Sequence, residues 1–314
     1  MSKALKRELH LVGKPEPALR QRARNHPAEL IRAMRPQQWL KSGFVFLGII
    51  FSGHWQQGQM LWRVALAAAA FSLMASGVYV MNDLLDREND QLHPVKQHRP
   101  IAAGRVSPSV ARSLMLALIT GGLGLAYAVS PADALILLIY LAQNIAYSRR
   151  LKQVVLLDVF IIAFGFMLRI LSGTIGVGIE PSNWLLLCGL MITLFIGFGK
   201  RLAELGVDSV GFRPVLDRYG RDVLNQFTGI CAGGAILTYG LYTLDPGTVA
   251  LHQTDDLIYT IPFVIYGVFR YLYLLHSGEG GDPSRLVAQD RHIAVTVALW
   301  LVSVVLILNQ KVLS

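Results

Sequence analysis

Nine apolar segments follow one another along the chain, and each is long enough to cross a lipid bilayer as a helix. Each has 17 to 22 residues, close to the roughly 20 that a helix needs to cross the hydrocarbon core. They are residues 39–55, 62–81, 109–129, 131–147, 154–175, 184–200, 223–243, 257–276 and 292–311. The third and fourth are joined only by Ser130 and Pro131, which indicates a tight helical hairpin. The pattern predicts an all-α membrane protein, a bundle of about nine transmembrane helices.

The composition excludes an ordinary soluble protein. Of the 314 residues, 53% are hydrophobic and 16% are charged, and the mean hydropathy is +0.46. Soluble domains have about 25% charged residues, so an integral membrane protein is expected. Cys188 and Cys231 lie within apolar segments, which argues against a disulfide or a cysteine-ligated metal. The basic N-terminus is not followed by an apolar core until Phe44, so no cleavable signal peptide is expected.

Basic residues are concentrated in alternate loops. The loops after even-numbered segments hold Arg87, Lys96, Arg99 and Arg105; Arg149, Arg150 and Lys152; Arg201, Arg213, Arg218 and Arg221; Arg285 and Arg291. The loops after odd-numbered segments hold almost none, and the positive-inside rule places the basic loops in the cytoplasm. We therefore expect a multi-pass protein of the cell (inner or plasma) membrane, with a cytoplasmic N-terminus and a periplasmic or extracellular C-terminus. The polar loops with reactive residues open on the cytoplasm, so the active site is expected to face it.

Two regions are expected. Residues 1–35 form a basic cytoplasmic N-terminal segment, and residues 36–314 form a single transmembrane domain. Residues 18–35 suit a basic helix on an anionic membrane surface, whereas a solvated tail is an equal alternative for residues 1–17. Membrane adhesion and subunit contact both remain open for this segment, as does a homo-oligomer. No nucleic-acid partner is expected.

An acidic motif directly follows the second apolar segment. Asp83, Asp86 and Asp90 are spaced by three and four residues, and Asn82 precedes Asp86 by four. On a continuing helix the three aspartates lie within about 60° of one another, on one face. Such a face suits Mg²⁺, which takes carboxylate oxygens and shares itself with substrate phosphates. A solvated helix end is the alternative, but the position beside the membrane in a basic protein favours a metal–diphosphate site.

Cations and two charged intramembrane residues accompany this motif. Lys96, Arg99 and Arg105 follow it and are natural counter-charges for phosphate oxygens. A carboxylate or guanidinium inside an apolar helix is costly and usually functional, and Asp158 and Arg169 are placed so in the fifth segment.

The alternatives at these positions are structural. Lys152 or a metal is the expected partner of Asp158, and a purely structural Asp158–Lys152 pair is the alternative. Arg169 is expected to pair with a phosphate or with an acidic side chain.

A third charged stretch follows the sixth segment. Lys200 and Arg201 precede Glu204 and Asp208, which are themselves spaced by four residues. The adjacent cations indicate that a second phosphate must be neutralised. The alternative is that Lys200 and Arg201 only anchor the helix at the membrane interface.

The motif and its sequel resemble a known superfamily. Asn-Asp-x-x-Asp-x-x-x-Asp at residues 82–90, followed by Arg-Pro-Ile-Ala-x-Gly-Arg-Val-Ser at residues 99–107, is similar to the UbiA-type intramembrane prenyltransferases. The resemblance extends from about residue 32 to 311 and agrees with nine helices. It implies that Asp83, Asp86 and Asp90 hold Mg²⁺ and, through it, a diphosphate, with Asn82 in support. Typical members have a second Asp-x-x-x-Asp motif after the sixth helix, where this chain has residues 199–208 with Lys200, Arg201 and Glu204.

Further residues resemble one branch of that superfamily, the decaprenyl-phosphate phosphoribosyltransferases. They are the run from Arg35 to Lys41, the pattern from Tyr147 through Lys152 to Asp158, and Gly199-Lys200-Arg201. The resemblance implies transfer of 5-phosphoribose from phosphoribosyl diphosphate to a polyprenyl phosphate, with release of diphosphate, for lipid-linked sugar or cell-wall precursor synthesis. It implies catalytic roles for Asp83, Asp86, Asp90, Lys152 and Asp158, and substrate binding by Asn82, Lys41, Lys96, Arg99, Arg105, Tyr147, Arg149, Arg169, Lys200, Arg201 and Glu204.

Three other functions stay open at this point. The nearest is a prenyltransferase that moves a prenyl group from a prenyl diphosphate to an aromatic acceptor; the altered second motif counts against it. A transporter or channel would use Asp158 and Arg169 but not the gathering of polar residues at one face. A non-catalytic scaffold would not need the aspartates. The acceptor's chain length, the stereochemistry and the downstream pathway are not indicated by the sequence.

Overall fold

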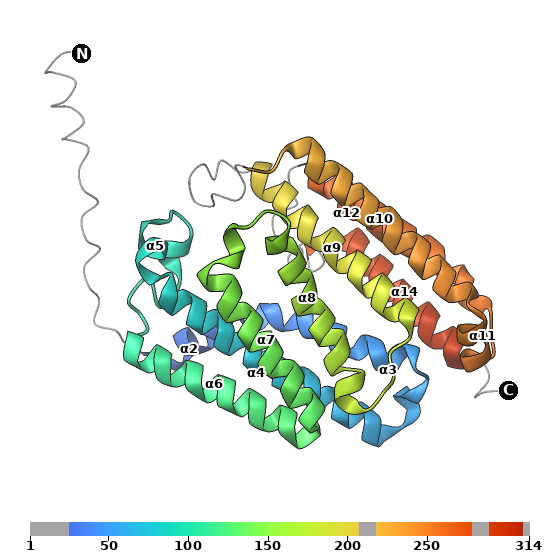
Figure 1. Ribbon diagram of the computed structural model, residues 1–314, viewed down its shortest axis with the longest axis horizontal. Coiled ribbons are helices and arrows are strands. Elements are labelled where there is room, and N and C mark those ends of the chain that lie inside the picture. The colour runs from blue at the N-terminus through green and yellow to red at the C-terminus, as the bar shows by residue number, and fades with distance from the viewer. Residues whose placement is uncertain (1–24, 207–217, 278–288, 310–314) are drawn as a thin grey trace, which may run out of the picture.

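The chain folds as a bundle of long helices. The computed structural model describes residues 25–206, 218–277 and 289–309, and within these ranges every regular element is helical (Figure 1). The long helices are α4 (Gly58–Leu85), α6 (Pro108–Val129), α7 (Pro131–Arg149), α8 (Leu157–Ser172), α9 (Asn183–Gly206), α10 (Arg221–Leu244), α12 (Ile261–His276) and α14 (Arg291–Asn309). The short ones are α2 (Pro27–Met34), α3 (Leu47–Phe51), α5 (Arg87–Leu92) and α11 (Pro246–His252). The 3₁₀ segments are η1 (Pro36–Phe46), η2 (His54–Gln56), η3 (Lys96–His98), η4 (Leu151–Gln153), η5 (Ile175–Val177) and η7 (Asp256–Thr260).

Seven segments of the described chain are long and apolar enough to cross a membrane. They are α4, α6, α9, α10 and α14, together with α8 continued through η5 and α12 preceded by η7. The predicted all-α membrane bundle is confirmed. Two of the nine predicted segments, 39–55 and 131–147, do not meet the same criterion.

The first predicted segment differs most from expectation. Instead of one α-helix it is the 3₁₀ segment η1 followed by the short helix α3. This segment lies directly against the end of α8: a Cβ on Gly173 would lie 1.7 Å from the carbonyl oxygen of Val45. On its other side the Trp39 indole donates to Ser76 Oγ of α4 at 2.9 Å. The sequence pattern shows the apolar character of this segment but not these close contacts, which need glycine on the facing helix.

The predicted hairpin is confirmed. Helices α6 and α7 are separated only by Ser130, whose Oγ accepts a hydrogen bond from the backbone N–H of Asp133. Ser107 caps α6 in the same way, and a proline follows each cap. Serine as the N-cap and proline as the first helical residue are standard start signals, so the local sequence sets both helix starts.

Two hydrophobic cores meet on α8. The first gathers residues from η1, α4, α6 and α7 and includes Leu168 of α8. The second gathers residues from α9, α10, α12 and α14 and includes Val159 and Ala163 of α8. Figure 1 shows α8 between the two groups of helices. This helix therefore fixes the position of each half of the bundle relative to the other.

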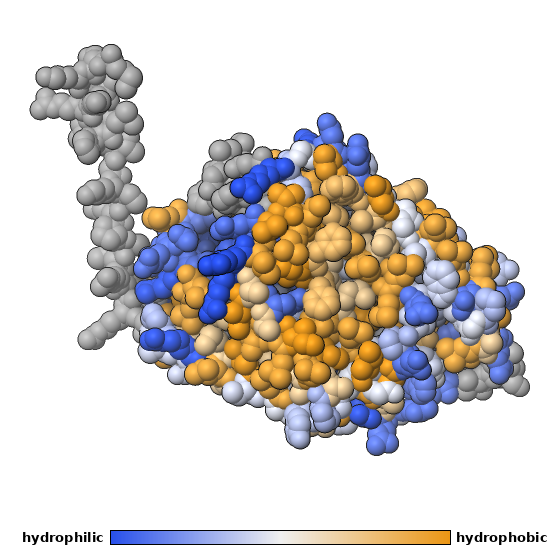
Figure 2. Space-filling view, viewed as in Figure 1, coloured by the Kyte–Doolittle hydropathy of each residue, from blue (hydrophilic) through white to orange (hydrophobic). Residues whose placement is uncertain are grey.

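Because the long helices run alternately up and down, their polar connections gather at one end. The α4–α6 connection with α5, the α7–α8 connection with η4, and the start of α10 all lie at this end (Figure 1). The face seen in Figure 2 is apolar across its middle and hydrophilic toward its ends. A bundle that spans a bilayer requires this distribution. The charged connections lie near one another at one end.

Candidate active site

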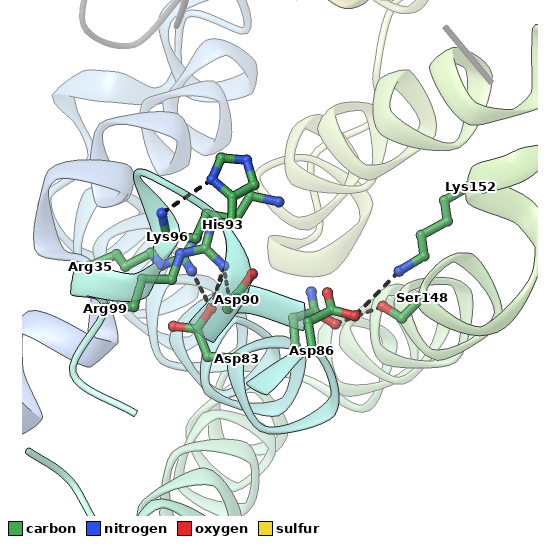
Figure 3. Close-up of polar contacts among 10 residues, drawn as sticks. Arg35, Asp83, Asp86, Asp90, His93, Lys96, Arg99, Ser148 and Lys152 are labelled. Atoms are coloured by element: carbon green, nitrogen blue, oxygen red, sulfur yellow. Dashed lines mark hydrogen bonds and ion pairs between the residues drawn. The ribbon is translucent and has the colours of Figure 1, made fainter. Parts of the chain in front are cut away.

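The acidic motif sits where α4 ends. Helix α4 stops at Leu85 and α5 starts at Arg87, with Asp86 between them at φ −93° and ψ 10°. Asp83 and Asp90 are both 2% exposed, whereas the Asp86 side chain is 39% exposed. Figure 3 shows Asp83 and Asp90 directed to one side and Asp86 directed to the other. The motif is therefore divided into two parts.

Two arginines hold the buried part. One Arg99 guanidinium nitrogen donates to Asp83 Oδ1 at 3.0 Å and to Asp90 Oδ2 at 2.6 Å. Arg35 donates to the same Asp83 oxygen at 2.5 Å and lies over the Tyr79 ring, 5.0 Å from its centroid. The buried carboxylates are thus neutralised by guanidinium groups that are themselves only partly buried.

The exposed part lies against the α7–α8 connection. Lys152 Nζ is 3.5 Å from Asp86 Oδ1, and Ser148 Oγ donates to Asn82 Oδ1 at 2.6 Å (Figure 3). The contact at 3.5 Å is long for a charge-assisted hydrogen bond, so Asp86 is the least tightly engaged carboxylate of the three. This corner is open to an incoming ligand.

The expectation of one continuous helix face is therefore corrected. The helix breaks at Asp86, and this carboxylate separates from Asp83 and Asp90. Among the described residues no group of three His, Cys, Asp or Glu side chains is placed to share one metal ion. The donor chemistry nevertheless fits Mg²⁺, because this ion is usually held by one or two carboxylates while substrate phosphates and waters complete its octahedron. Asp86, half-exposed beside the amide oxygen of Asn82, offers such a partial set.

A second polar cluster lies between α7, α8 and α9, and its central ion pair is buried. The Arg201 side chain is 1% exposed and Asp158 is 0% exposed. Arg201 Nε donates to Asp158 Oδ2 at 2.6 Å, and other guanidinium nitrogens donate to Glu204 Oε2 at 2.5 Å and to the Tyr147 hydroxyl at 3.4 Å. Tyr147 directly precedes Ser148, so the end of α7 joins the two clusters.

The contacts in this cluster differ from those that the sequence suggests. The guanidinium nitrogens of Arg201 donate hydrogen bonds to protein side chains, and almost none of the side chain is exposed to bind a phosphate. The partner of Asp158 is Arg201 and not Lys152, whose ion-pair contact is Asp86. Arg201 is 43 residues from Asp158, so the local spacing that suggested Lys152 could not reveal it. Asp208, the other half of the altered second motif, lies outside the described residues.

Tyr219 completes the second cluster. Its hydroxyl donates to Asp158 Oδ1 at 2.7 Å and accepts the backbone N–H of Leu156 at 2.6 Å. Burial, together with the hydrogen bond to Asp158, raises the pKa of Tyr219, so its hydroxyl keeps the proton that it donates. Leu156 has a positive φ of 68° at the start of α8, a costly conformation for a residue other than glycine. The tyrosine thus stabilises a strained turn that follows Lys152.

Arg169 and Arg105 lie elsewhere. Arg169 is buried in the first core, donating to Gly165 O at 2.7 Å and to the Tyr140 hydroxyl at 3.3 Å, with its guanidinium over the Phe71, Tyr140 and Phe166 rings. Arg105 pairs with Glu29 at 2.8 Å, which attaches the N-terminal segment to the loop after α5. These contacts leave neither arginine beside the carboxylates of the acidic motif.

Three of the remaining predicted substrate-binding residues lie at the polar end of the bundle: Lys96 in η3, the exposed Arg149 at the end of α7, and Lys200 next to Arg201 on α9. Lys41 in η1 lies further along the bundle, because the hydroxyl of the next residue, Ser42, accepts a hydrogen bond from Ser72 in the middle of α4. Sequence reasoning missed three site residues: Arg35, Ser148 and Tyr219. Arg35 and Ser148 stood within the sequence runs that carried the family resemblance, which was the available signal. Tyr219 had none, because it is 61 residues from Asp158.

Comparison with known proteins gives one consistent result. The model of the UbiA prenyltransferase family matches residues 43–293. A decaprenyl-phosphate phosphoribosyltransferase of Corynebacterium glutamicum is 30% identical over 311 residues, covering 95% of this chain and 92% of the relative. The enzyme of that name from Mycobacterium tuberculosis is 30% identical, covering 89% and 94%. A UbiA homolog from Archaeoglobus fulgidus bound to GPP and Mg²⁺ superposes with a TM-score of 0.69 at 16% identity, covering 90% of this chain and 99% of that one.

Proposed function

Because the chain belongs to the UbiA prenyltransferase family, we propose that it transfers 5-phosphoribose from phosphoribosyl diphosphate to a polyprenyl phosphate such as decaprenyl phosphate. Diphosphate is released, and the product serves lipid-linked sugar or cell-wall precursor synthesis. The observation that carries the proposal is the likeness to decaprenyl-phosphate phosphoribosyltransferases at about 30% identity over nearly the full length of both partners. An aromatic acceptor for a prenyl diphosphate is the other candidate within the family.

The charge of the site supports two anionic substrates. Arg35, Arg99 and Lys152 surround the acidic motif, and all three are partly exposed. Phosphoribosyl diphosphate and a polyprenyl phosphate are both polyanions, and bringing them together requires a high density of cations. An aromatic acceptor would need fewer.

Mg²⁺ is the proposed cofactor. Asp86, with Asn82 in support, is the residue that would hold it together with the donor's diphosphate. When bound it would neutralise charge on the departing diphosphate. The solved UbiA homolog bound to GPP and Mg²⁺ supports divalent metal use in this fold.

The chain's own residues would supply the rest. Lys152 and Arg99 would contact phosphate oxygens and stabilise the charge that develops as the bond between the anomeric carbon and diphosphate breaks. An oxygen of the lipid phosphate forms the new bond to that carbon, so the electron pair of the broken bond leaves with diphosphate. A phosphate monoester is already an anion, so no strong general base is needed. Asp158 would act indirectly, by fixing Arg201 and the turn that carries Lys152.

The proposed setting is the cell membrane, with the site on its cytoplasmic face. Phosphoribosyl diphosphate is water-soluble and would enter from the polar end of the bundle. The polyprenyl tail would stay among membrane lipids along the apolar helix faces. The basic loops at the polar end support this orientation by the positive-inside rule.

A transfer assay on the purified full-length protein tests the proposal. Labelled phosphoribosyl diphosphate, decaprenyl phosphate and Mg²⁺ are supplied, and label is measured in the lipid phase. We expect transfer that EDTA abolishes and that Asp86→Ala reduces at least 100-fold. A folded protein that transfers nothing, yet moves a prenyl group from a prenyl diphosphate to an aromatic acid, would replace this proposal with the other family activity.

A further inference from the structure

We propose that Asp83 is a positioning residue, not a metal ligand, and that Arg35, which it holds, binds the donor's diphosphate. This inference rests on the proposed function for the identity of the donor. It assigns to the N-terminal segment a direct part in the site, and it separates Asp83 from Asp86 within one motif.

Asp83 is buried and hydrogen-bonded to two arginines. One of its oxygens, Oδ1, accepts hydrogen bonds from both Arg35 and Arg99, and the residue is 2% exposed. A Mg²⁺ ion that keeps waters and shares a substrate's phosphates needs an accessible carboxylate oxygen. Asp86, 39% exposed and 3.5 Å from Lys152, meets that requirement, whereas Asp83 does not.

The direction of the side chains carries the second step. Asp83 points toward Arg35 and Arg99, and Asp86 points toward Lys152 and Ser148 (Figure 3). One Arg99 nitrogen contacts both Asp83 and Asp90, so these two carboxylates share a cation that Asp86 does not contact in the structure. Asp86 contacts Lys152 instead, and α4 ends at the residue before it.

The backbone of Arg35 carries the third step. Arg35 has φ 56° and ψ 62°, a left-handed conformation that glycine adopts far more readily than arginine. A side chain kept at such a position must make contacts that offset the strain, and strain of this kind is commonest at functional sites. Its guanidinium has the Asp83 carboxylate on one side and the Tyr79 ring on another, and 24% of the side chain stays exposed. That exposed portion can take a further anion.

The anchoring of the N-terminal segment carries the last step. Glu29 pairs with Arg105 at 2.8 Å, and Asn25 Oδ1 accepts the backbone N–H of Ser107 at 2.9 Å. Helix α2 is thus held against the loop that also bears Arg99. A guanidinium held in place by a carboxylate loses less side-chain freedom on binding phosphate than a mobile one does. Asp83 holds Arg35 in this way.

Two binding measurements on the full chain in detergent test the inference. Mn²⁺ binding in the absence of donor is followed by the loss of the free-ion paramagnetic resonance signal. Binding of inorganic diphosphate in the presence of Mg²⁺ is followed by calorimetry.

We expect Asp86→Asn to weaken the affinity for Mn²⁺ at least tenfold, while Asp83→Asn and Arg35→Gln change that affinity less than about threefold. We expect Asp83→Asn and Arg35→Gln each to weaken diphosphate by about ten- to 100-fold, the range for one hydrogen bond to a charged group. The double variant should be little worse than the worse single one, because Asp83 acts through Arg35.

Arg32→Gln is the matched control, since Arg32 lies on the same short segment, is 67% exposed and pairs only locally with Glu29. It should change neither measurement. Loss of Mn²⁺ in Asp83→Asn comparable to that in Asp86→Asn would overturn the positioning role. Unchanged diphosphate affinity in Arg35→Gln, whose side chain is partly exposed and tolerant of change, would overturn the phosphate contact even if Asp83→Asn failed to fold. Diphosphate is common to both candidate donors, so failure of the phosphoribosyl proposal would appear separately, as wild-type protein that binds diphosphate but not phosphoribosyl diphosphate.

Discussion

The Asp158–Arg201 pair has both members buried, and so its removal should cost far more than the loss of a surface contact. We expect Arg201→Met to destabilise the fold by about 3–5 kcal/mol, because Asp158 would be left as an uncompensated buried charge and Glu204 would lose its partner. Thermal unfolding in detergent measures the loss. Arg221→Met, at an exposed position at the start of α10, is the control and should unfold like the wild type. If Arg201→Met unfolds at the same temperature as this control, the Asp158–Arg201 pair does not stabilise the fold, and a phosphate contact becomes the better assignment for Arg201.

At the same scale, sequence reasoning found the charged residues of the site but not their partners. Asp83, Asp86 and Asp90 stand out by spacing and by position after an apolar run. Arg35 is 48 residues from Asp83, and Arg201 is 43 residues from Asp158. Periodicity relates residues within one helix, so it carries no information on contacts between helices this far apart in the chain. This is why Lys152 was assigned to Asp158 and a phosphate to Arg201.

Among the elements, the contact between η1 and the end of α8 is the closest backbone approach described above. We expect Gly173→Ala to lower the unfolding midpoint strongly, because its Cβ would meet the carbonyl oxygen of Val45 at 1.7 Å and backbone atoms must then separate. Gly43→Ala, within η1 itself, is the control, since a Cβ there meets nothing within 4 Å. Thermal unfolding of both variants provides the test, and equal midpoints would mean that η1 is not packed against α8 in this way.

The start of α14 provides a prediction about pH. The hydrogen bond from Arg270 lowers the pKa of Asp290 below its ordinary value of 3.8. Since the folded-state pKa is the lower one, the pair stabilises the fold above about pH 4, and this contribution is lost as pH falls through the lowered pKa. Asp290→Asn retains a side-chain oxygen able to cap α14, where Asp290 Oδ1 accepts the N–H of Ile293. The difference in unfolding midpoint between wild type and Asp290→Asn should be constant from pH 5 to 8, should shrink as pH falls below about 4, and should disappear once the pH is below the lowered pKa of Asp290. A difference that grew on acidification would contradict this assignment.

Element boundaries were predictable wherever the local sequence carried the signal. The α6–α7 hairpin, with Ser130 before Pro131, was expected and found. The segment 39–55 was expected as one helix because only its apolar character is visible in the sequence. Its contacts with Ser76 of α4 and Gly173 of α8 join residues that lie far apart along the chain, so they are not visible in the local sequence.

For the whole molecule, the predicted orientation can be tested by labelling from either side of the membrane. In a background with Cys188 and Cys231 replaced by alanine, single cysteines are placed at Gln97 and Glu180, two exposed residues at opposite ends of the bundle. We expect an impermeant thiol reagent to label Glu180→Cys in intact cells and Gln97→Cys only after permeabilisation. The reverse pattern would place the acidic motif outside the cytoplasm and would contradict the proposal that the water-soluble donor enters the site from the cytoplasm.

The number of spans also belongs to this scale. An α-helix rises about 1.5 Å per residue and a 3₁₀-helix about 2.0 Å, so the 11 residues of η1 and the 5 of α3 together extend about 30 Å. Helix α7, with 19 residues, extends about 28 Å. Both lengths match a hydrocarbon core of about 30 Å, which supports adding these two segments to the seven apolar ones.

The winding of η1 also sets a length on which the site depends. The same 11 residues wound as an α-helix would be about 5 Å shorter. Arg35 immediately precedes η1, while the other end of η1 is fixed against Gly173. A shortening of that size exceeds the reach of a hydrogen bond, so Arg35 would be drawn away from Asp83. The extended pitch of the 3₁₀ segment therefore holds Arg35 level with Asp83.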